Sequence, residues 1–293
     1  MDERTALSVL ADRLGPAGDD AAVVEDLVVT IDMLHASTDF PDETTRYTAG
    51  WRAVGASLSD IAAMGADPVA AVAVYAAPSF ESEQLLAFVD GAIAVCEAVG
   101  GEYVGGDLDE NPEFSAVTAA IGRTDDPVFR SGTDPGDVVC VTGTLGRSAA
   151  ALALFADGQT DRANDLFRFD PRVASGRTLA PFATAMMDSS DGLARSLHQL
   201  AEASDVGIAV ESPLPIDETV EAVASNEDDR REMGVFFGED FELVCTIDPD
   251  DLAAARRAVP ISLSPIGRVV DGDAVTLDGE ALADRGFTHG GSD

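Results

Sequence analysis

The pattern of apolar and polar positions in the first half of the chain predicts strands and helices in alternation. Two short apolar runs, Ala21–Val24 and Leu27–Ile31, flank an acidic turn and predict a β-hairpin. The pattern then predicts a helix over 46–65, a strand over 69–76, a helix over 81–99, and strands over 102–104 and 114–122. This ββαβαββ order is typical of a mixed sheet with helices on one face.

The second half of the chain restarts with a strand after a segment rich in Pro, Gly and Asp over residues 124–136. Strands are predicted over 137–141, 207–210, 243–247, 266–270 and 274–277, and helices over 148–156, 161–180, 193–203, 217–225 and 250–258. We therefore predict an α/β protein of the α+β type. We place an N-terminal domain at residues 1–130 and a C-terminal domain at residues 131–293.

The net charge of the chain is its most unusual property. There are 54 acidic residues against 18 basic ones, a formal net charge of −36, and the sequence contains no lysine. Large uncompensated negative charge favours solubility where salt screens the self-repulsion, so we predict a salt-loving, halophilic source. The sign of the charge makes nucleic acid a poor partner, because the phosphate backbone is also negative.

The remaining composition indicates a soluble, cytoplasmic protein. No apolar run is long enough to span a bilayer, and the first residues have charges of both signs without the layout of a signal peptide. The three cysteines, Cys96, Cys140 and Cys245, are widely spaced and lie in apolar segments. This placement predicts buried free thiols in a reducing compartment and no disulfide.

Several carboxylates lie where surface residues are uncommon. Because 54 of 293 residues are acidic, we consider only acids beside Gly, small residues or apolar runs. These are Asp20, Asp32, Asp60, Asp107, Asp188, Asp191 and Glu239. Converging carboxylates repel one another unless a cation lies between them, and oxygen ligands without His or Cys favour Mg²⁺. The sequence therefore predicts a site for several Mg²⁺ ions, with a polyphosphate as cargo.

Each of these features also has a simpler explanation that the sequence leaves open. The acids of the hairpin fit an acidic solvent edge, and Asp60 fits an ordinary helix surface. Ser190 or Asp191 fits a helix N-cap, and Arg130 fits a surface cation that balances acids. The strand over 137–141 leads into a Gly-rich turn over 142–146 and a helix start near residue 148, which predicts an anion site without the lysine of a P-loop.

Nine segments in order resemble the thiamine-monophosphate kinase family, within the aminoimidazole ribonucleotide synthetase-like superfamily. They are GDDAAV (18–23), TIDMLHASTDF (30–40), LSDIAAMGADP (58–68), GGD (105–107), FRSG (129–132), GDVVCVTGTLGRSAAAL (136–152), DSSDGL (188–193), GEDFEL (238–243) and GF (286–287). The resemblance implies a two-domain PurM-like fold, with mixed sheets that are each covered by helices, and a homodimer that pairs through the first domain. It also implies phosphorylation of thiamine monophosphate to thiamine diphosphate by ATP.

The resemblance assigns roles to the matching residues. The implied Mg²⁺ ligands are Asp20, Thr30, Ile31 (through its backbone), Asp32, Asp60, Asp107, Asp188 and Asp191. The implied ATP contacts are Gly106, Asp107, Arg130 and Ser190, and the catalytic set is Asp107, Asp188 and Arg130. The implied substrate contacts are Glu239, Phe287, which stacks on a thiamine ring, and Asp39, where many relatives carry histidine.

The chemistry implied by the resemblance is direct in-line transfer of a phosphoryl group, assisted by several Mg²⁺ ions. The acceptor is already a phosphate oxyanion, so no general base is required. Two alternatives remain: another ATP-using member of the superfamily, and a non-catalytic scaffold that binds nucleotide or metal. Selenophosphate synthetases use an N-terminal Cys or selenocysteine with a nearby Lys, and the hydrogenase-maturation protein uses a C-terminal Cys, neither of which this sequence has.

Overall fold

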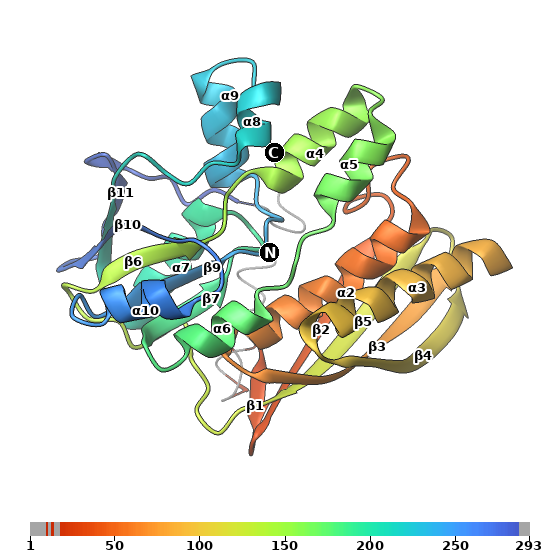
Figure 1. Ribbon diagram of the computed structural model, residues 1–293, viewed down its shortest axis with the longest axis horizontal. Helices are drawn as coiled ribbons and strands as arrows, with labels where there is room; N and C mark the ends of the chain where they lie inside the picture. Colours follow the sequence, from red (N-terminus) through yellow and green to blue (C-terminus); the bar gives the residue numbers. More distant parts are fainter. Residues whose placement is uncertain (1–9, 11–12, 15–17, 287–293) are drawn as a thin grey trace.

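The computed structural model describes residues 10, 13, 14 and 18–286 as two mixed β-sheets with helices packed against them (Figure 1). The first sheet and its helices are β1 (Ala22–Val24), β2 (Leu27–His35), α2 (Arg46–Ala63), β3 (Asp67–Ala77), α3 (Ser82–Val99), β4 (Glu102–Glu110) and β5 (Ser115–Arg123). The predicted ββαβαββ order is confirmed, and so is the hairpin, in which Val24 pairs with Leu27.

The first sheet has the strand order β1-β2-β5-β3-β4, and only β3 and β4 run parallel. Helices α2 and α3 cover one face of this sheet (Figure 1). Gly50 of α2 lies against the backbone of Phe88, and Gly91 of α3 lies against that of Tyr47, where a Cβ atom would come within 2.0 Å of a carbonyl oxygen. The small residues of α2 therefore let the two helices pack at backbone distance.

The opposite face of the first sheet has no helix on it among the described residues. Ile31, Met33, Val72 and Ile121 are exposed there, and Ile31 is 71% exposed. We call these four side chains the open apolar face.

Strand β4 is longer than the sequence pattern predicts. Gly105, Gly106 and Asp107 lie inside this edge strand and do not form a turn that follows it.

The second sheet has the order β12-β11-β8-β10-β6-β9-β7, with β8 and β11 parallel. Its elements are β6 (Val138–Thr142), α4 (Arg147–Ala156), α5 (Thr160–Phe167), α6 (Val173–Leu179), β7 (Ala183–Asp188), α7 (Leu193–Ser204), β8 (Gly207–Val210), α8 (Glu218–Val223), α9 (Glu227–Arg231), the π-helix η1 (Glu232–Phe236), β9 (Leu243–Ile247), α10 (Leu252–Ala258), β10 (Leu263–Val270), β11 (Val275–Leu277) and β12 (Glu280–Ala281). Helix α9 consists of charged residues only and buries none of them.

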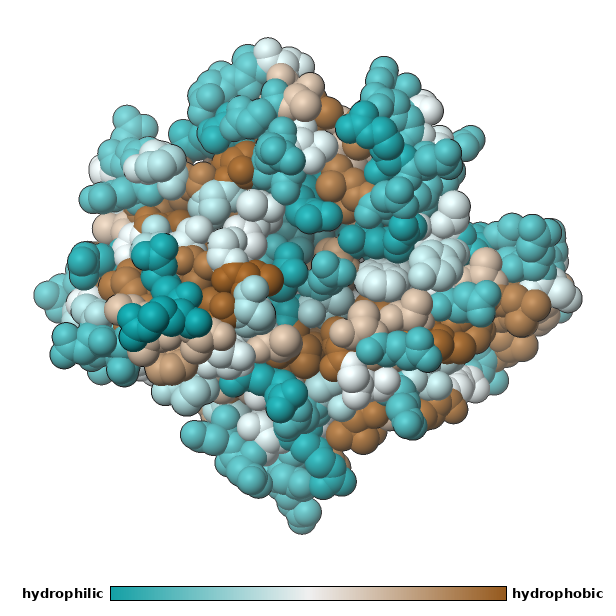
Figure 2. All heavy atoms as spheres, viewed as in Figure 1, coloured by the Kyte–Doolittle hydropathy of each residue, from teal (hydrophilic) through white to brown (hydrophobic). Residues whose placement is uncertain are grey.

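The two halves share a continuous apolar contact through α2. Ala62 and Ala63 at the end of this helix pack in one cluster with Leu179 and Met186 of the second half. Hydrophilic residues cover much of the rim of the molecule in Figure 2, and hydrophobic residues reach the surface in patches. All three cysteines are buried and free, as predicted. None of the helices within the described ranges is long and apolar enough to cross a membrane.

Candidate active site

Three carboxylates from distant parts of the chain meet where the two halves join. Asp20 precedes β1, Asp60 lies in α2, and Asp188 ends β7. One oxygen of each lies within 4.8 Å of the oxygens of the other two. Asp20 and Asp188 are only 9% and 2% exposed, so the group does not form an acidic solvent edge. We call Asp20, Asp60 and Asp188 the carboxylate cluster.

The electrostatics of the carboxylate cluster indicate a place for a cation. Burial, followed by the charge of Asp20, raises the pKa of Asp188 to about 8. Burial and the neighbouring carboxylates raise the pKa of Asp60 well above its usual range. One oxygen each of Asp20 and Asp188 is buried without a hydrogen-bond partner among the described residues. Buried oxygens that lack donors, with no His or Cys beside them, fit a hard divalent ion such as Mg²⁺.

Polar side chains around the cluster hold its members in place. The Thr30 hydroxyl donates to Asp60, and the Ser57 hydroxyl donates to Asp32 at 2.7 Å. Asp32 lies near enough to raise the pKa of Asp60, although burial contributes more. Thr30 and Asp32 come from the face of β2 that packs on α2, as the period-2 pattern requires, and Ser57 and Asp60 come from α2.

Arg130 is the cation of this site and is not a surface residue that balances distant acids. Its guanidinium donates to Asp20 at 2.6 Å, and its backbone N–H donates to Asp19 at 3.0 Å. Burial and the adjacent Asp20 raise the pKa of Asp19 to about 6. The sequence analysis quoted Asp19 within GDDAAV but did not select it. The clue was the acidic doublet itself, since Asp19 directly follows Gly18 and precedes Asp20.

Asp107 lies apart from the carboxylate cluster within one chain. It pairs with Val74 of β3, Val74 pairs with Val117 of β5, and Val117 pairs with Met33 of β2. This row belongs to the open apolar face, whereas Asp32, one residue before Met33, faces α2. Three strand spacings separate β4 from β2, which amounts to about 14 Å. Asp107 therefore does not share the side of the sheet on which Asp32 and, in α2, Asp60 lie, although all three were predicted to gather.

The other predicted ligands lie in several positions. The side chain of Ile31 belongs to the open apolar face, so only the backbone of this residue is available on the side of the sheet where the Thr30 and Asp32 side chains lie. Asp191 and Ser190 lie in the loop between β7 and α7, and no side chain caps α7, so capping does not explain them. Gly106 packs so closely on Ala73 that a Cβ atom would come within 1.7 Å of its carbonyl oxygen. Phe287 lies outside the described residues.

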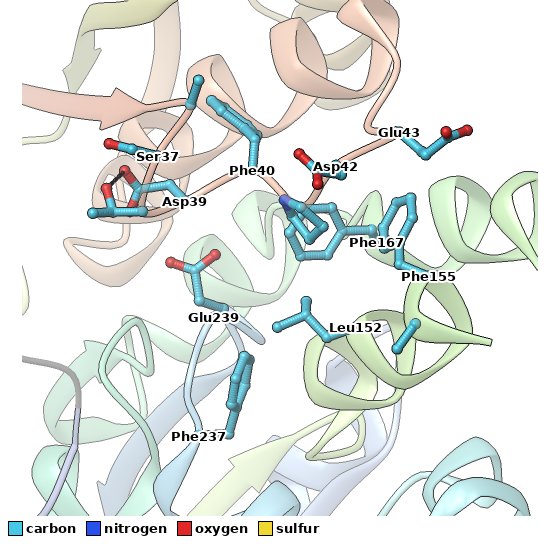
Figure 3. A pocket seen from close by; sticks show the side chains of 14 residues that line it. Ser37, Asp39, Phe40, Asp42, Glu43, Leu152, Phe155, Phe167, Phe237 and Glu239 are labelled. Atoms are coloured by element: carbon cyan, nitrogen blue, oxygen red, sulfur yellow. Dashed lines mark hydrogen bonds between the residues drawn. The ribbon is translucent and has the colours of Figure 1, made fainter. Parts of the chain in front are cut away.

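A cavity of about 790 Å³ is lined by three segments that are distant in sequence (Figure 3). Burial and the charge of Glu239, which lines this cavity, raise the pKa of Asp32, so the cavity lies close to the residue that neighbours the carboxylate cluster. Residues 36–43 line one side, α4 and α5 line another, and residues 237 and 239 line the third. Phe40, Leu152, Phe155, Phe167 and Phe237 supply apolar surface, and Asp39, Asp42, Glu43 and Glu239 supply carboxylates. The predicted substrate residues Asp39 and Glu239 therefore line one cavity. Its chemistry suits a ligand with aromatic rings and positive charge.

The Gly-rich turn over 142–148 is not open to an external anion. The carboxylate of Asp240 accepts hydrogen bonds from the backbone N–H groups of Gly146 and Ser148, at 2.5 Å and 3.0 Å. Asp240 is therefore the anion at the start of α4. Burial raises its pKa to about 7, while the two N–H donors act in the opposite direction. The sequence pattern identified the site correctly but not its occupant, because Asp240 is almost one hundred residues away.

Comparison with known proteins agrees with this architecture. Residues 18–124 match the AIR synthase related protein, N-terminal domain, and residues 134–280 match the AIR synthase related protein, C-terminal domain. A thiamine-monophosphate kinase of Halobacterium salinarum is 62% identical over 291 residues, which cover 99% of this chain and 100% of that protein.

Solved structures show the same fold. The thiamine-monophosphate kinase from Stenotrophomonas maltophilia is 33% identical with a TM-score of 0.82, over 94% of this chain and 95% of that one. AaThiL complexed with AMPPCP and TMP is 27% identical with a TM-score of 0.90, over 98% and 97%. The predicted two-domain PurM-like fold with mixed sheets is confirmed. The fold, the two matched family models and a relative that is similar over its full length show that the chain belongs to the thiamine-monophosphate kinase family of AIR synthase-related proteins.

Proposed function

We propose that the chain transfers the γ-phosphoryl group of ATP to thiamine monophosphate. A phosphate oxygen of the acceptor attacks the γ-phosphorus, the bond to the β–γ bridging oxygen breaks, and ADP leaves. The products are thiamine diphosphate and ADP. The observation that carries this proposal is the position of the carboxylate cluster beside an acidic, aromatic cavity. Relatives that are similar over nearly the whole chain bear the name of this activity.

The residues of the cluster suit the phosphate end of the reaction. We assign Asp20, Asp60 and Asp188, with Asp32 beside them, as the residues that hold Mg²⁺. When bound, Mg²⁺ would neutralise charge on the phosphate groups and align them. Arg130 adds a fixed positive charge next to Asp20, which matters in a chain without lysine. The acceptor needs no general base, so the high pKa of Asp188 does not imply a base role.

The cavity suits the organic end of the substrate. A thiazolium ring carries a permanent positive charge, and both rings of thiamine are flat. Carboxylates such as Asp39 and Glu239 would attract the charge, and aromatic side chains such as Phe237 would contact the ring faces. In Figure 3 these groups surround the cavity from both halves of the chain.

A product assay tests the proposed function. The chain is incubated with Mg-ATP and thiamine monophosphate, free thiamine or an aminoimidazole precursor, and the products are separated. We expect thiamine diphosphate from the monophosphate only, with inversion at a chirally labelled γ-phosphorus. A scaffold would bind Mg-ATP without forming product, and retention of configuration would contradict direct transfer. A product from the aminoimidazole precursor would instead support another activity of the superfamily.

We also propose that two copies of the chain associate through the open apolar face. A contiguous row of exposed apolar side chains on a sheet is a common mark of an interface. Asp107 lies on the same side of the sheet, where it could act only on a second copy. A symmetric dimer would bury both open faces at once. Asp107 would then face the partner copy, away from its own chain's cluster.

Placing a charge on the open apolar face is expected to separate the two copies. Ile31→Glu would bury a carboxylate against apolar side chains, which costs several kcal/mol when no partner neutralises it. We expect sedimentation velocity at micromolar concentration to give the monomer mass. Leu86→Glu, at an exposed apolar residue on α3, is the control and should keep the dimer mass. If both variants keep the dimer mass, the interface lies elsewhere.

Binding of Mg²⁺ is expected to release protons near neutral pH. Asp188 has a pKa of about 8, so at pH 7 it holds a proton that a bound cation must displace. The affinity for Mg²⁺ should therefore rise as the pH is raised from 6 to about 8, and the release should fade above that. Calorimetry in buffers of different ionisation enthalpy measures the released protons. Asp188→Asn should remove most of the release, and an unchanged release would assign it to another group.

A further inference from the structure

Helix α2 carries a fully buried arginine that the sequence analysis did not select. Arg52 is 1% exposed, and its guanidinium lies 3.6 Å from the centre of the Phe167 ring. The rings of Phe169 and Phe241 lie at 5.2 Å and 5.7 Å. A charge in such surroundings is costly, so its partners should explain why it is there.

The polar partners of Arg52 converge on one side chain of the cavity wall. One terminal nitrogen forms an ion pair with the carboxylate of Glu239. The other donates to the carbonyl of Phe167 and, at 3.3 Å, to the hydroxyl of Ser148. That hydroxyl donates in turn to the backbone carbonyl of Glu239 at 2.6 Å. The side chain and the backbone of Glu239 are therefore both tied to Arg52.

The loop that contains Glu239 has a conformation that needs such support. Glu239 and Phe241 have φ angles of 63° and 53°, in a backbone region that residues other than glycine rarely adopt. The backbone N–H of Glu239 donates to Ser190 at 2.6 Å, and Phe241 stacks on Phe169. The loop is thus fixed in a strained form, with the carboxylate of Glu239 at the cavity.

We propose that Arg52 is a positioning residue that holds Glu239 at the cavity wall and thereby sets the affinity for thiamine monophosphate. This inference rests on the proposed function, because it takes that molecule as the ligand of the cavity. Arg52 does not line the cavity itself and acts through Glu239. The guanidinium is required because a planar fork can reach a carboxylate and a carbonyl together, which an ammonium group does less well.

The position of Arg52 in α2 links the two ends of the site. Asp60 lies eight residues further along the same helix, which is about 12 Å along its axis. One rigid helix therefore sets the distance between the carboxylate cluster and the side chain that Arg52 holds. Loss of the Arg52 contact should move the organic end of the substrate without disturbing the phosphate end.

The test compares Arg52→Lys with the wild-type chain in kinetics and in direct binding. We expect KM and the equilibrium Kd for thiamine monophosphate to rise about tenfold or more, while KM for ATP stays within about twofold. The control is Arg172→Lys. Arg172 holds Glu242 of the same loop at 2.6 Å, but Glu242 does not line the cavity. This control should lower thermal stability and change KM for thiamine monophosphate by less than about threefold.

A double-mutant cycle separates positioning from general structural damage. If Arg52 acts through Glu239, Arg52→Lys in a Glu239→Gln background should change Kd for thiamine monophosphate by less than about twofold. An equal effect in both backgrounds, or an equal rise in both KM values, would overturn the inference. A wild-type chain that forms thiamine diphosphate but shows no selective Arg52 effect overturns this inference alone. A wild-type chain that neither binds nor phosphorylates thiamine monophosphate overturns it together with the proposed function.

Discussion

Replacing Asp188 by asparagine is expected to lower the rate of thiamine diphosphate formation about 10³-fold or more. Asp188 supplies one oxygen of the carboxylate cluster, and the amide that replaces it has no negative charge to offer a cation. The loss should appear in kcat, because the charge acts on the phosphate groups during transfer. Steady-state kinetics over a range of Mg²⁺ concentrations measures the loss and shows whether added metal restores activity.

The stability of the same variant distinguishes a lost ligand from a lost fold. A folded pKa that is raised to about 8 means that wild-type stability without Mg²⁺ falls as the pH rises towards 8. Asp188→Asn removes this loss, so its melting temperature should exceed that of the wild type at pH 8 and approach it at pH 4.

Asp137→Asn is the matched control, since Asp137 is buried but accepts hydrogen bonds from Thr133 and Thr184. It should lose about 1–2 kcal/mol of stability and keep its Mg²⁺ dependence. An active Asp188→Asn variant would refute the metal assignment.

Replacing Asp107 by asparagine is also expected to abolish turnover, although Asp107 lies on the opposite side of the sheet from Asp32. The resemblance places Asp107 among the catalytic residues, and the structure leaves it on the side of the open apolar face. Asp107 can have a catalytic role and also lie on that side of the sheet if it contributes to the active site of a second copy of the chain. The variant should keep its fold and dimer mass, because the side chain is exposed and the hydrogen bond that it accepts from the backbone N–H of Leu108 is local.

Mixing two inactive variants tests this arrangement. In a heterodimer of Asp107→Asn and Asp188→Asn, one site would carry both substitutions and the other would carry neither. After random exchange of subunits, about a quarter of wild-type activity should return. The Ile31→Glu substitution in both partners should prevent this recovery. If the mixture stays inactive while mass analysis shows that heterodimers have formed, then Asp107 acts within its own chain or has no role.

Much of the fold could be predicted from the sequence because local patterns determine it. The hairpin, helix α2 and the order of elements in the first half follow from apolar periodicity. Asp20, Asp60 and Asp188 were selected because an acid within an apolar or small-residue setting is poorly suited to the surface, and the structure brings these three together. The assignment of these three and of the remaining residues as metal ligands, and the domain boundary at residue 130, stay predictions.

The remaining features depend on contacts between distant residues, which a single sequence does not reveal. The sequence pattern ends the strand at residue 104, but β4 continues through Asp107, and the pleat then directs this side chain away from the cluster. Asp240 and Arg52 were missed because their partners lie on other elements almost one hundred or more residues away. The halophilic source predicted from the net charge of −36 also stays a prediction, because net charge describes the whole molecule and not any particular contact in the structure.

The position of the bound metal tests the central claim most directly. Crystals of the chain grown with AMPPCP and Mn²⁺ in place of Mg²⁺ would show the metal by its anomalous scattering. We predict a peak at coordination distance, about 2.0–2.3 Å, from oxygens of Asp20, Asp60 and Asp188, and next to the nucleotide phosphates. An ordered nucleotide with its metal elsewhere, and no peak among these three carboxylates, would contradict the account.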